Sequence, residues 1–175
     1  PQGSARQPSV SADGRYVAYT STYDWRDDFD DRADDVFRFD RQTGTTVHLS
    51  GTWHGDGEDI GGFANNPSIS GDGNLVAFAS DGGDSVVDED TGSGTQIFVR
   101  NVEAGVTTFV SRAADGRPPR DDSREPAISG NGRYVFFSST ASNITPEGGP
   151  GLYRHDRRTG DVIMVSVTPA GAAAD

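Results

Sequence analysis

The chain has 175 residues, of which 33% are hydrophobic, and its formal net charge at pH 7 is −12. A chain of this length can bury about 70% of its unfolded surface, which is enough for a stable domain. The negative charge argues against nucleic acid as a partner, because such a site needs a basic patch. The absence of cysteine excludes disulfides and thiolate metal sites. No run of about 18 apolar residues occurs, so no membrane-spanning helix is expected.

One segment of the sequence recurs three times. QPSVSADGRYVAYTS at residues 7–21 returns as NPSISGDGNLVAFAS at 66–80 and as EPAISGNGRYVFFSS at 125–139. Consecutive copies lie 59 residues apart. A period of this length indicates a repeat architecture, in which each unit stacks on its neighbours because it cannot bury its own apolar faces alone.

Each copy begins a unit that predicts four short strands. In the first unit, tight turns at Asp13-Gly14 and Thr43-Gly44 each separate two β-rich runs. The expected strands of this unit, residues 7–50, are 9–11, 15–20, 36–40 and 45–50. In the second unit, residues 66–111, they are 68–70, 75–79, 96–100 and 106–111. In the third unit, residues 125–167, they are 127–129, 133–138, 152–156 and 162–167, and the linkers between units are 51–65 and 112–124.

These elements predict an all-β chain that forms one β-propeller domain, or part of one, over residues 1–175. We expect three four-stranded antiparallel blades. Near-continuous apolar strands such as LVAFA at 75–79 and YVFFS at 134–138 indicate sheets that are covered on both faces, as in stacked blades. No helical periodicity is present. A parallel β-solenoid is the structural alternative, although its rungs usually lack two hairpin turns per repeat.

The repeated pattern also has a familiar form. Pro-Ser-(Ile/Val)-Ser-x-Asp-Gly-Arg-Tyr-Val-Ala-Phe-x-Ser, followed by a (Val/Ile)-Phe-x-Arg strand and a Thr-Gly turn, resembles the TolB-type, WD-like (PD-motif) β-propeller repeat of bacteria. The resemblance covers nearly the whole chain. The sequence departs from the pattern at Asn131, at His155, and at Asn101, where the other units carry Asp40 and Asp156. These substitutions are compatible with the β-propeller fold that the resemblance implies.

Three blades do not close a ring, since propellers typically have about four to eight. A bare blade face of roughly 300 Å² forgoes on the order of 8 kcal/mol of hydrophobic stabilisation. That loss is comparable with the whole stability of a typical domain. We therefore predict that the open faces are covered, either by a second copy in a six-bladed homodimer or by further blades missing from this sequence.

The long loops are predicted to lie together at one end of the blades, because an antiparallel meander places its tight turns at the other end. We expect binding at the long-loop end. Two loops there, 22–35 and 81–94, are rich in acidic residues, which are either solvated or form a calcium site. The candidate metal ligands are Asp84, Asp88 and Asp90 in one loop and Asp28, Asp30 and Asp34 in the other.

Aromatic residues near these loops are candidates for a peptide or sugar platform, or else anchors tucked against the sheet. The candidate binding residues are Tyr23, Trp25, Phe29, Trp53 and His54. The last of these, with Asp56, is a weak metal signal. His48 lies in a predicted strand and is interpreted as structural.

No Gly-x-Ser-x-Gly nucleophile motif occurs in the chain. The first functional hypothesis is a non-enzymatic, secreted or periplasmic binding or scaffold propeller that engages a protein, peptide or envelope component. The alternative is a propeller part or accessory domain of a hydrolase, since the resemblance extends to propellers that precede the catalytic domain of prolyl-oligopeptidase-like enzymes. A carbohydrate-active enzyme with paired loop carboxylates belongs to the same alternative.

Overall fold

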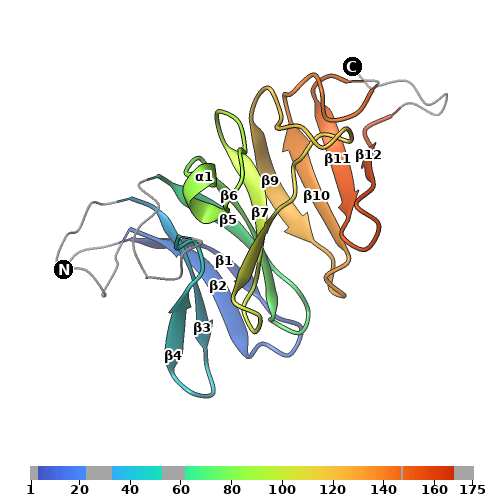
Figure 1. The fold of residues 1–175 in the computed structure, drawn as a ribbon. Coiled ribbons are helices and arrows are strands. Elements are labelled where there is room, and N and C mark those ends of the chain that lie inside the picture. The colour runs from blue at the N-terminus through green and yellow to red at the C-terminus, as the bar shows by residue number, and fades with distance from the viewer. Residues whose placement is uncertain (1–3, 23–32, 53–61, 147, 168–175) are drawn as a thin grey trace.

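The computed structural model describes residues 4–22, 33–52, 62–146 and 148–167. It contains three four-stranded antiparallel sheets, each formed by consecutive strands of one repeat unit. Figure 1 shows them as successive layers, blue, green and orange, with the second sheet between the other two. The predicted all-β fold with three blades is confirmed.

The strands follow the three units in order. Blade 1 contains β1 (Ala5–Val10), β2 (Tyr16–Ser21), β3 (Asp35–Asp40) and β4 (Thr45–His48). Blade 2 contains β5 (Ala64–Ile69), β6 (Leu75–Ser80), β7 (Gln96–Asn101) and β8 (Val106–Phe109). Blade 3 contains β9 (Ser123–Ile128), β10 (Tyr134–Ser139), β11 (Gly151–Asp156) and β12 (Val162–Met164). One short helix, α1 (Gly83–Val86), lies in the long loop of blade 2, where no helical periodicity was found.

The first strand of every blade begins earlier than predicted and contains a bulge. The residue before the proline that recurs in each unit has a positive φ, and the register with the second strand shifts at this point. A positive φ is uncommon for residues other than glycine, and the bulge interrupts the alternation of side chains on which strand prediction depends. The three residues are Gln7, Asn66 and Glu125, with φ of 54°, 54° and 55°.

Two hydrophobic layers hold the blades together. Between blades 1 and 2, the fully buried side chains include Ala18, Val36, Val76, Phe78 and Phe98. Between blades 2 and 3, they include Ala77, Ile97, Val135, Phe137 and Tyr153. Because successive side chains of a strand point to opposite faces, blade 2 contributes to both layers.

The same alternation leaves one face of each outer blade without a neighbouring sheet. The open face of blade 1 carries Val17, Tyr19 and Phe39, which line a hollow of about 600 Å³. The open face of blade 3 carries Leu152, which is 42% exposed. Its equivalent in blade 2 is Ile97, which is fully buried.

Candidate functional site

The two ends of the blades differ in the length of their connections. The turns 11–15, 41–44, 70–74, 102–105, 129–133 and 157–161 form the short-turn end. The described connections 81–95, 110–122 and 140–146 form the long-loop end. The arrangement is the one that an antiparallel meander requires.

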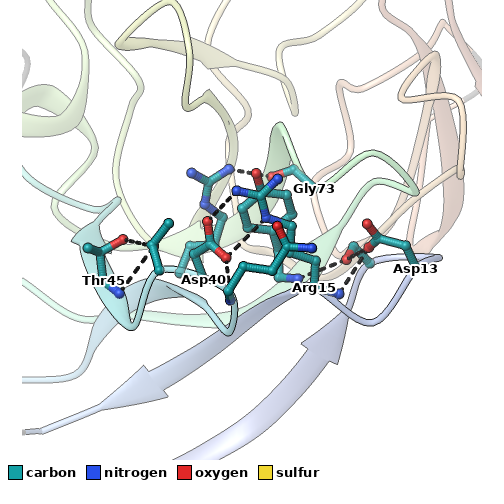
Figure 2. A network of polar contacts seen from close by, with 10 residues as sticks. Asp13, Arg15, Asp40, Thr45 and Gly73 are labelled. Atoms are coloured by element: carbon teal, nitrogen blue, oxygen red, sulfur yellow. Dashed lines mark hydrogen bonds and ion pairs between the residues drawn. The ribbon is translucent and has the colours of Figure 1, made fainter.

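At the short-turn end of blade 1, Arg15 and Asp40 form a two-point ion pair. The Arg15 Nε and Nη2 atoms donate to the two carboxylate oxygens of Asp40 at 3.1 and 2.7 Å (Figure 2). This guanidinium, together with the Gln42 backbone N–H, holds the pKa of the Asp40 carboxyl well below its usual range. The pair joins the start of β2 to the end of β3 and so closes the sheet at this end.

The same network docks blade 1 onto blade 2. Arg15 and Arg38 both lie over the Tyr16 ring, with their Cζ atoms 4.7 and 4.3 Å from the ring centroid. Arg38 Nη1 donates to the carbonyl oxygen of Gly73 in the first turn of blade 2 at 2.7 Å (Figure 2). Gly73 has a φ of +76°, and a Cβ atom there would lie 2.1 Å from the Tyr16 ring. Only glycine fits this contact.

Blade 3 repeats the ion pair, whereas blade 2 replaces both partners. Arg133 donates to Asp156 at 2.6 Å and, with the Arg158 backbone N–H, lowers the pKa of Asp156 to about 2. In blade 2 the equivalent residues are Asn74 and Asn101, whose side-chain oxygens accept backbone N–H groups of the following turn at 2.9 and 3.0 Å. The ion pair occurs in blades 1 and 3, and blade 2 replaces both of its partners together. This pattern indicates a structural role for the pair.

A Ser, His and Asp cluster lies at the other end of blade 1. Ser50 Oγ donates to Asp35 Oδ1 at 2.6 Å, and His48 Nε2 lies 2.9 Å from the same oxygen and 3.0 Å from Ser50 Oγ. A catalytic triad uses the two imidazole nitrogens separately, one for serine and one for the carboxylate. Here Nε2 faces both groups, and Ser50 is fully buried. The cluster therefore lacks the geometry of an activated nucleophile.

The other blades show what this serine does. Ser50 Oγ accepts the Val36 N–H at 3.0 Å, and Ser111 and Ser166 accept the N–H of the matching third-strand residue at the same distance. Ser111 Oγ also donates to Gln96, which replaces Asp35. The serine ties the last strand to the third strand in every blade, so the interpretation of His48 as structural agrees with its contacts.

Hydrogen bonds brace the long loops of blades 2 and 3 into one layer, here called the loop layer (81–95, 110–122 and 140–146). Asp122 Oδ1 accepts the Thr95 N–H at 2.8 Å. Asn143 accepts the Arg120 N–H at 2.9 Å and donates to the Pro118 carbonyl at 3.0 Å. These bonds join segments far apart in sequence, so the loop layer is held together by contacts of its own.

A hollow of about 310 Å³ opens beside the loop layer, at the start of β9 and the end of β10. Asp122 and Arg124 lie on its wall and form an ion pair of 2.6 Å. The Arg124 side chain and the Thr95 N–H lower the pKa of the Asp122 carboxyl. The remaining lining residues are Ser138, Ser139, Thr140, Pro150 and Gly151. The hydroxyl groups of Ser138, Ser139 and Thr140 donate to the backbone carbonyls of Asp122 and Arg124. The exposed Arg124 guanidinium is therefore the group on this wall that can donate to a ligand.

The aromatic binding candidates fall outside the described residues. This holds for Tyr23, Trp25, Phe29, Trp53 and His54, and also for the metal candidates Asp28 and Asp30. Asp34, the third member of that metal set, is described and is ion-paired with Arg6.

The structure does not bring Asp84, Asp88 and Asp90 together as a metal site. Asp84 Oδ1 accepts the N–H and the hydroxyl of Thr91 at 3.0 and 2.9 Å, and Asp90 Oδ1 accepts the Gly92 N–H at 2.9 Å. Asp88 is exposed. Within the described residues, no group of three or more His, Cys, Asp or Glu side chains is placed to hold a metal ion. Loop hydrogen bonding accounts for the positions of Asp84 and Asp90.

The hollow beside β9 was missed by the sequence reasoning. Asp122 and Arg124 both lie at the end of the predicted linker 112–124, and neither position belongs to the repeated pattern. The signal that was available is the hydroxyl-rich run Ser138-Ser139-Thr140 after a predicted strand. It becomes a site only when β9 and β10 pair.

Comparison with known proteins identifies the fold class. No protein-family model matches the chain, and no curated protein sequence does. Among solved structures, a puromycin-hydrolysing peptidase of Mycobacterium tuberculosis matches 93% of this chain with 13% identity and a TM-score of 0.54. A prolyl endopeptidase matches 97% with 17% identity and a TM-score of 0.53. The tricorn protease matches 94% with 16% identity and a TM-score of 0.52.

In each comparison this chain spans only a fraction of the other protein. It covers 20% of the puromycin-hydrolysing peptidase, 22% of the prolyl endopeptidase and 13% of the tricorn protease. At this identity the likeness shows the fold alone, a β-propeller arrangement of blades. No helix among the described residues has the length and apolar character needed to span a bilayer.

Proposed function

We propose that this chain is a non-enzymatic binding or scaffold unit of the TolB-type propeller class that engages a protein or peptide through its long-loop end. The observation that carries the proposal is the loop layer, whose segments are held by hydrogen bonds between blades 2 and 3. A preorganised surface loses less conformational entropy when a partner binds. The resemblance to the bacterial repeat supports a secreted or periplasmic location.

The polar hollow beside β9 gives this surface a point of specificity. Arg124 is exposed over 59% of its side chain although it is paired with Asp122, so its remaining donors face solvent. A guanidinium with free donors binds carboxylate or carbonyl oxygens of a peptide in a fixed geometry. We therefore expect an extended peptide segment to pass over Arg124 and the hydroxyl groups of β10.

The test is selection of a phage-displayed peptide library on the immobilised chain. The enriched peptides are then titrated against Arg124→Ala and against Arg158→Ala, an exposed arginine at the short-turn end. We expect Arg124→Ala to weaken binding about tenfold, which corresponds to about 1.4 kcal/mol, and Arg158→Ala to leave it unchanged. Peptides that bind both variants like the parent chain would refute the proposed surface.

A propeller part of a peptidase is the second candidate, favoured by the likeness to propeller-containing peptidases. In that case the long-loop end would contact a catalytic domain supplied separately. Native mass spectrometry with the isolated catalytic domain of a prolyl oligopeptidase measures this contact directly. Turnover of a Gly-Pro-aminomethylcoumarin substrate by the chain alone, lost in Ser50→Ala, would instead assign catalysis to the chain and contradict both readings.

A further inference from the structure

The open face of blade 3 carries the groups with which blade 1 docks onto blade 2. Tyr134 and Arg154 occupy the positions of Tyr16 and Arg38, and the Arg154 Cζ atom lies 5.1 Å from the Tyr134 ring centroid. In blade 1 this stacked pair contacts the turn glycine of the next blade, Gly73. The same pair in blade 3 therefore continues an interface that the molecule already uses once.

The Arg154 guanidinium stacks on Tyr134 but meets no hydrogen-bond acceptor within the described part of the chain. The Nε atoms of Arg38 and Arg154 are both buried without an acceptor there, so the difference between the two arginines lies in their Nη atoms, and those of Arg154 donate no hydrogen bond among the described residues. Arg38, by contrast, reaches the Gly73 carbonyl at 2.7 Å. Arg154 is half-buried, and its Nη atoms would gain a hydrogen bond if a neighbouring blade brought a turn carbonyl to them, as Gly73 does for Arg38.

A backbone ladder points in the same direction. The Ala12 N–H donates to the Gly71 carbonyl at 2.9 Å, and the Gly71 N–H donates to the Gly130 carbonyl at 2.8 Å. Each blade thus offers its turn N–H to the carbonyl of the following blade. The next donor in the series is the Gly130 N–H, which meets no acceptor among the described residues.

We propose that the open face of blade 3, formed by Tyr134, Leu152 and Arg154, binds a further blade of the same repeat type and not a second copy of this chain. The occupant presents a glycine at the position of Gly73, so that the Tyr134 ring seats on its turn. Its turn carbonyl accepts a hydrogen bond from Arg154. The position equivalent to Arg41 is not arginine in that blade.

The condition on the position equivalent to Arg41 follows from the interface between blades 1 and 2 and the interface between blades 2 and 3. Between blades 1 and 2, Arg38 reaches the Gly73 carbonyl, and the residue of blade 2 equivalent to Arg41 is Val102. Between blades 2 and 3, Arg157 reaches the Gly132 carbonyl at 2.9 Å, and the residue of blade 2 equivalent to Arg38 is Val99. Each interface has one arginine at the turn carbonyl.

A second copy does not satisfy this pattern. Its Gly14 carbonyl already accepts Arg41 Nη1 at 2.8 Å, so Arg154 would bring a second guanidinium to the same oxygen. Like charges at such a distance repel, and more strongly when the interface excludes water. A head-to-tail copy therefore meets a charge conflict that neither existing interface contains.

A second, independent mismatch lies on the innermost strands. The Ile69 N–H donates to Ser9 Oγ at 3.1 Å, and the Ile128 N–H donates to Ser68 Oγ at 3.0 Å. The third position in this series is Ala127, which has no hydroxyl group. A second copy would bring its Val10 N–H against the Ala127 methyl group and leave that donor unsatisfied.

The experiment removes both mismatches and measures self-association. Arg41→Val copies Val102, and Ala127→Ser copies Ser9 and Ser68, so both substitutions already occur at equivalent positions of this fold. Sedimentation velocity over a concentration series should show the parent chain as a monomer. The double variant should associate head to tail with a dissociation constant lower by at least about tenfold.

Two further variants identify the surface. Arg158→Val combined with Ala127→Ser changes the net charge as much as the double variant does, but it alters an exposed arginine outside the open faces. Its dissociation constant for self-association should stay close to that of the parent chain. Arg154→Ala added to the double variant should return its self-association to the level of the parent chain. Thermal melts of every variant establish that it is folded. A parent chain that associates as tightly as the double variant would overturn the proposal, and so would a folded double variant that gains nothing.

Discussion

Blade 2 has a neighbouring blade on both faces, whereas blade 3 has one on a single face. Side chains at equivalent positions of the two blades therefore differ in their exposure. Ile97 of blade 2 is fully buried, while Leu152 at the same position of blade 3 is 42% exposed. The blade with two neighbours does without the Arg and Asp ion pair that closes the other two. Burial between blades, rather than any property of a single blade, is therefore the main source of stability in this stack.

The largest expected effect comes from the matched pair Ile97→Ala and Leu152→Ala. Ile97→Ala should lower the free energy of unfolding by about 2–5 kcal/mol, because it leaves a cavity between blades 2 and 3. Leu152→Ala should cost less than about 1 kcal/mol, because its side chain is exposed to solvent on the open face. Urea unfolding followed by circular dichroism measures both values. Equal losses would mean that the open face of blade 3 is covered in solution.

The next effect distinguishes two turn glycines. Gly73→Ala should cost roughly 2–4 kcal/mol, since a Cβ atom meets the Tyr16 ring at 2.1 Å and the φ of +76° strains any side chain. Gly14→Ala should cost only about 1 kcal/mol, because its φ is similar at +70° but its nearest neighbour is the tip of Arg41 at 3.7 Å. Thermal and chemical unfolding of both variants tests the difference. A loss of unfolding free energy in Gly14→Ala as large as that in Gly73→Ala would show that another group packs against the turn of blade 1 in solution.

The ion pair of blade 3 should appear in the dependence of stability on pH. The pKa of Asp156 is lowered to about 2 in the folded chain, below that of an unfolded aspartate at about 3.9. Its stabilisation is therefore fully present above about pH 4 and is lost as the pH falls through about 2. Asp156→Asn should be less stable than the parent at neutral pH and should show a shallower decline in melting temperature between about pH 4 and pH 2.

The control for this experiment is Asp161→Asn, a carboxylate in the same turn that pairs with no arginine in the described structure. Its pH profile should parallel that of the parent chain. A profile of Asp156→Asn with the full parental slope would mean that other carboxylates dominate acid unfolding.

The smallest expected effect concerns calcium. Because the Asp84 and Asp90 carboxylates are engaged by loop hydrogen bonds, we expect melting temperatures in calcium and in EDTA to differ by less than about 1 °C. A larger shift that disappears in Asp88→Asn would locate an ion in the loop of blade 2. A shift that survives this substitution would point instead to Asp28, Asp30 and Asp34.

The number and order of the strands, and the end of each blade that carries the long loops, were predictable because they depend on local chemistry. Turn pairs such as Asp13-Gly14, and apolar runs such as Leu75 to Ala79, specify hairpins without reference to distant residues. The bulge at Gln7 was not predictable in this way, because its positive φ is set by pairing with β2. The hollow lined by Asp122 and Arg124 was missed for a similar reason, since its wall is assembled from two strands and a loop.

By itself, the sequence determined that this protein is a stack of three similar four-stranded sheets, since a repeated hydrophobic pattern can bury itself only against its own kind. Only the tertiary structure decided which equivalent residues of the repeat make different contacts. Arg38 and Arg154 stand at the same place in the repeat, yet Arg38 donates to the next blade and Arg154 meets no acceptor among the described residues. The difference arises because a hydrogen bond between blades depends on what lies across the interface, which no single repeat encodes.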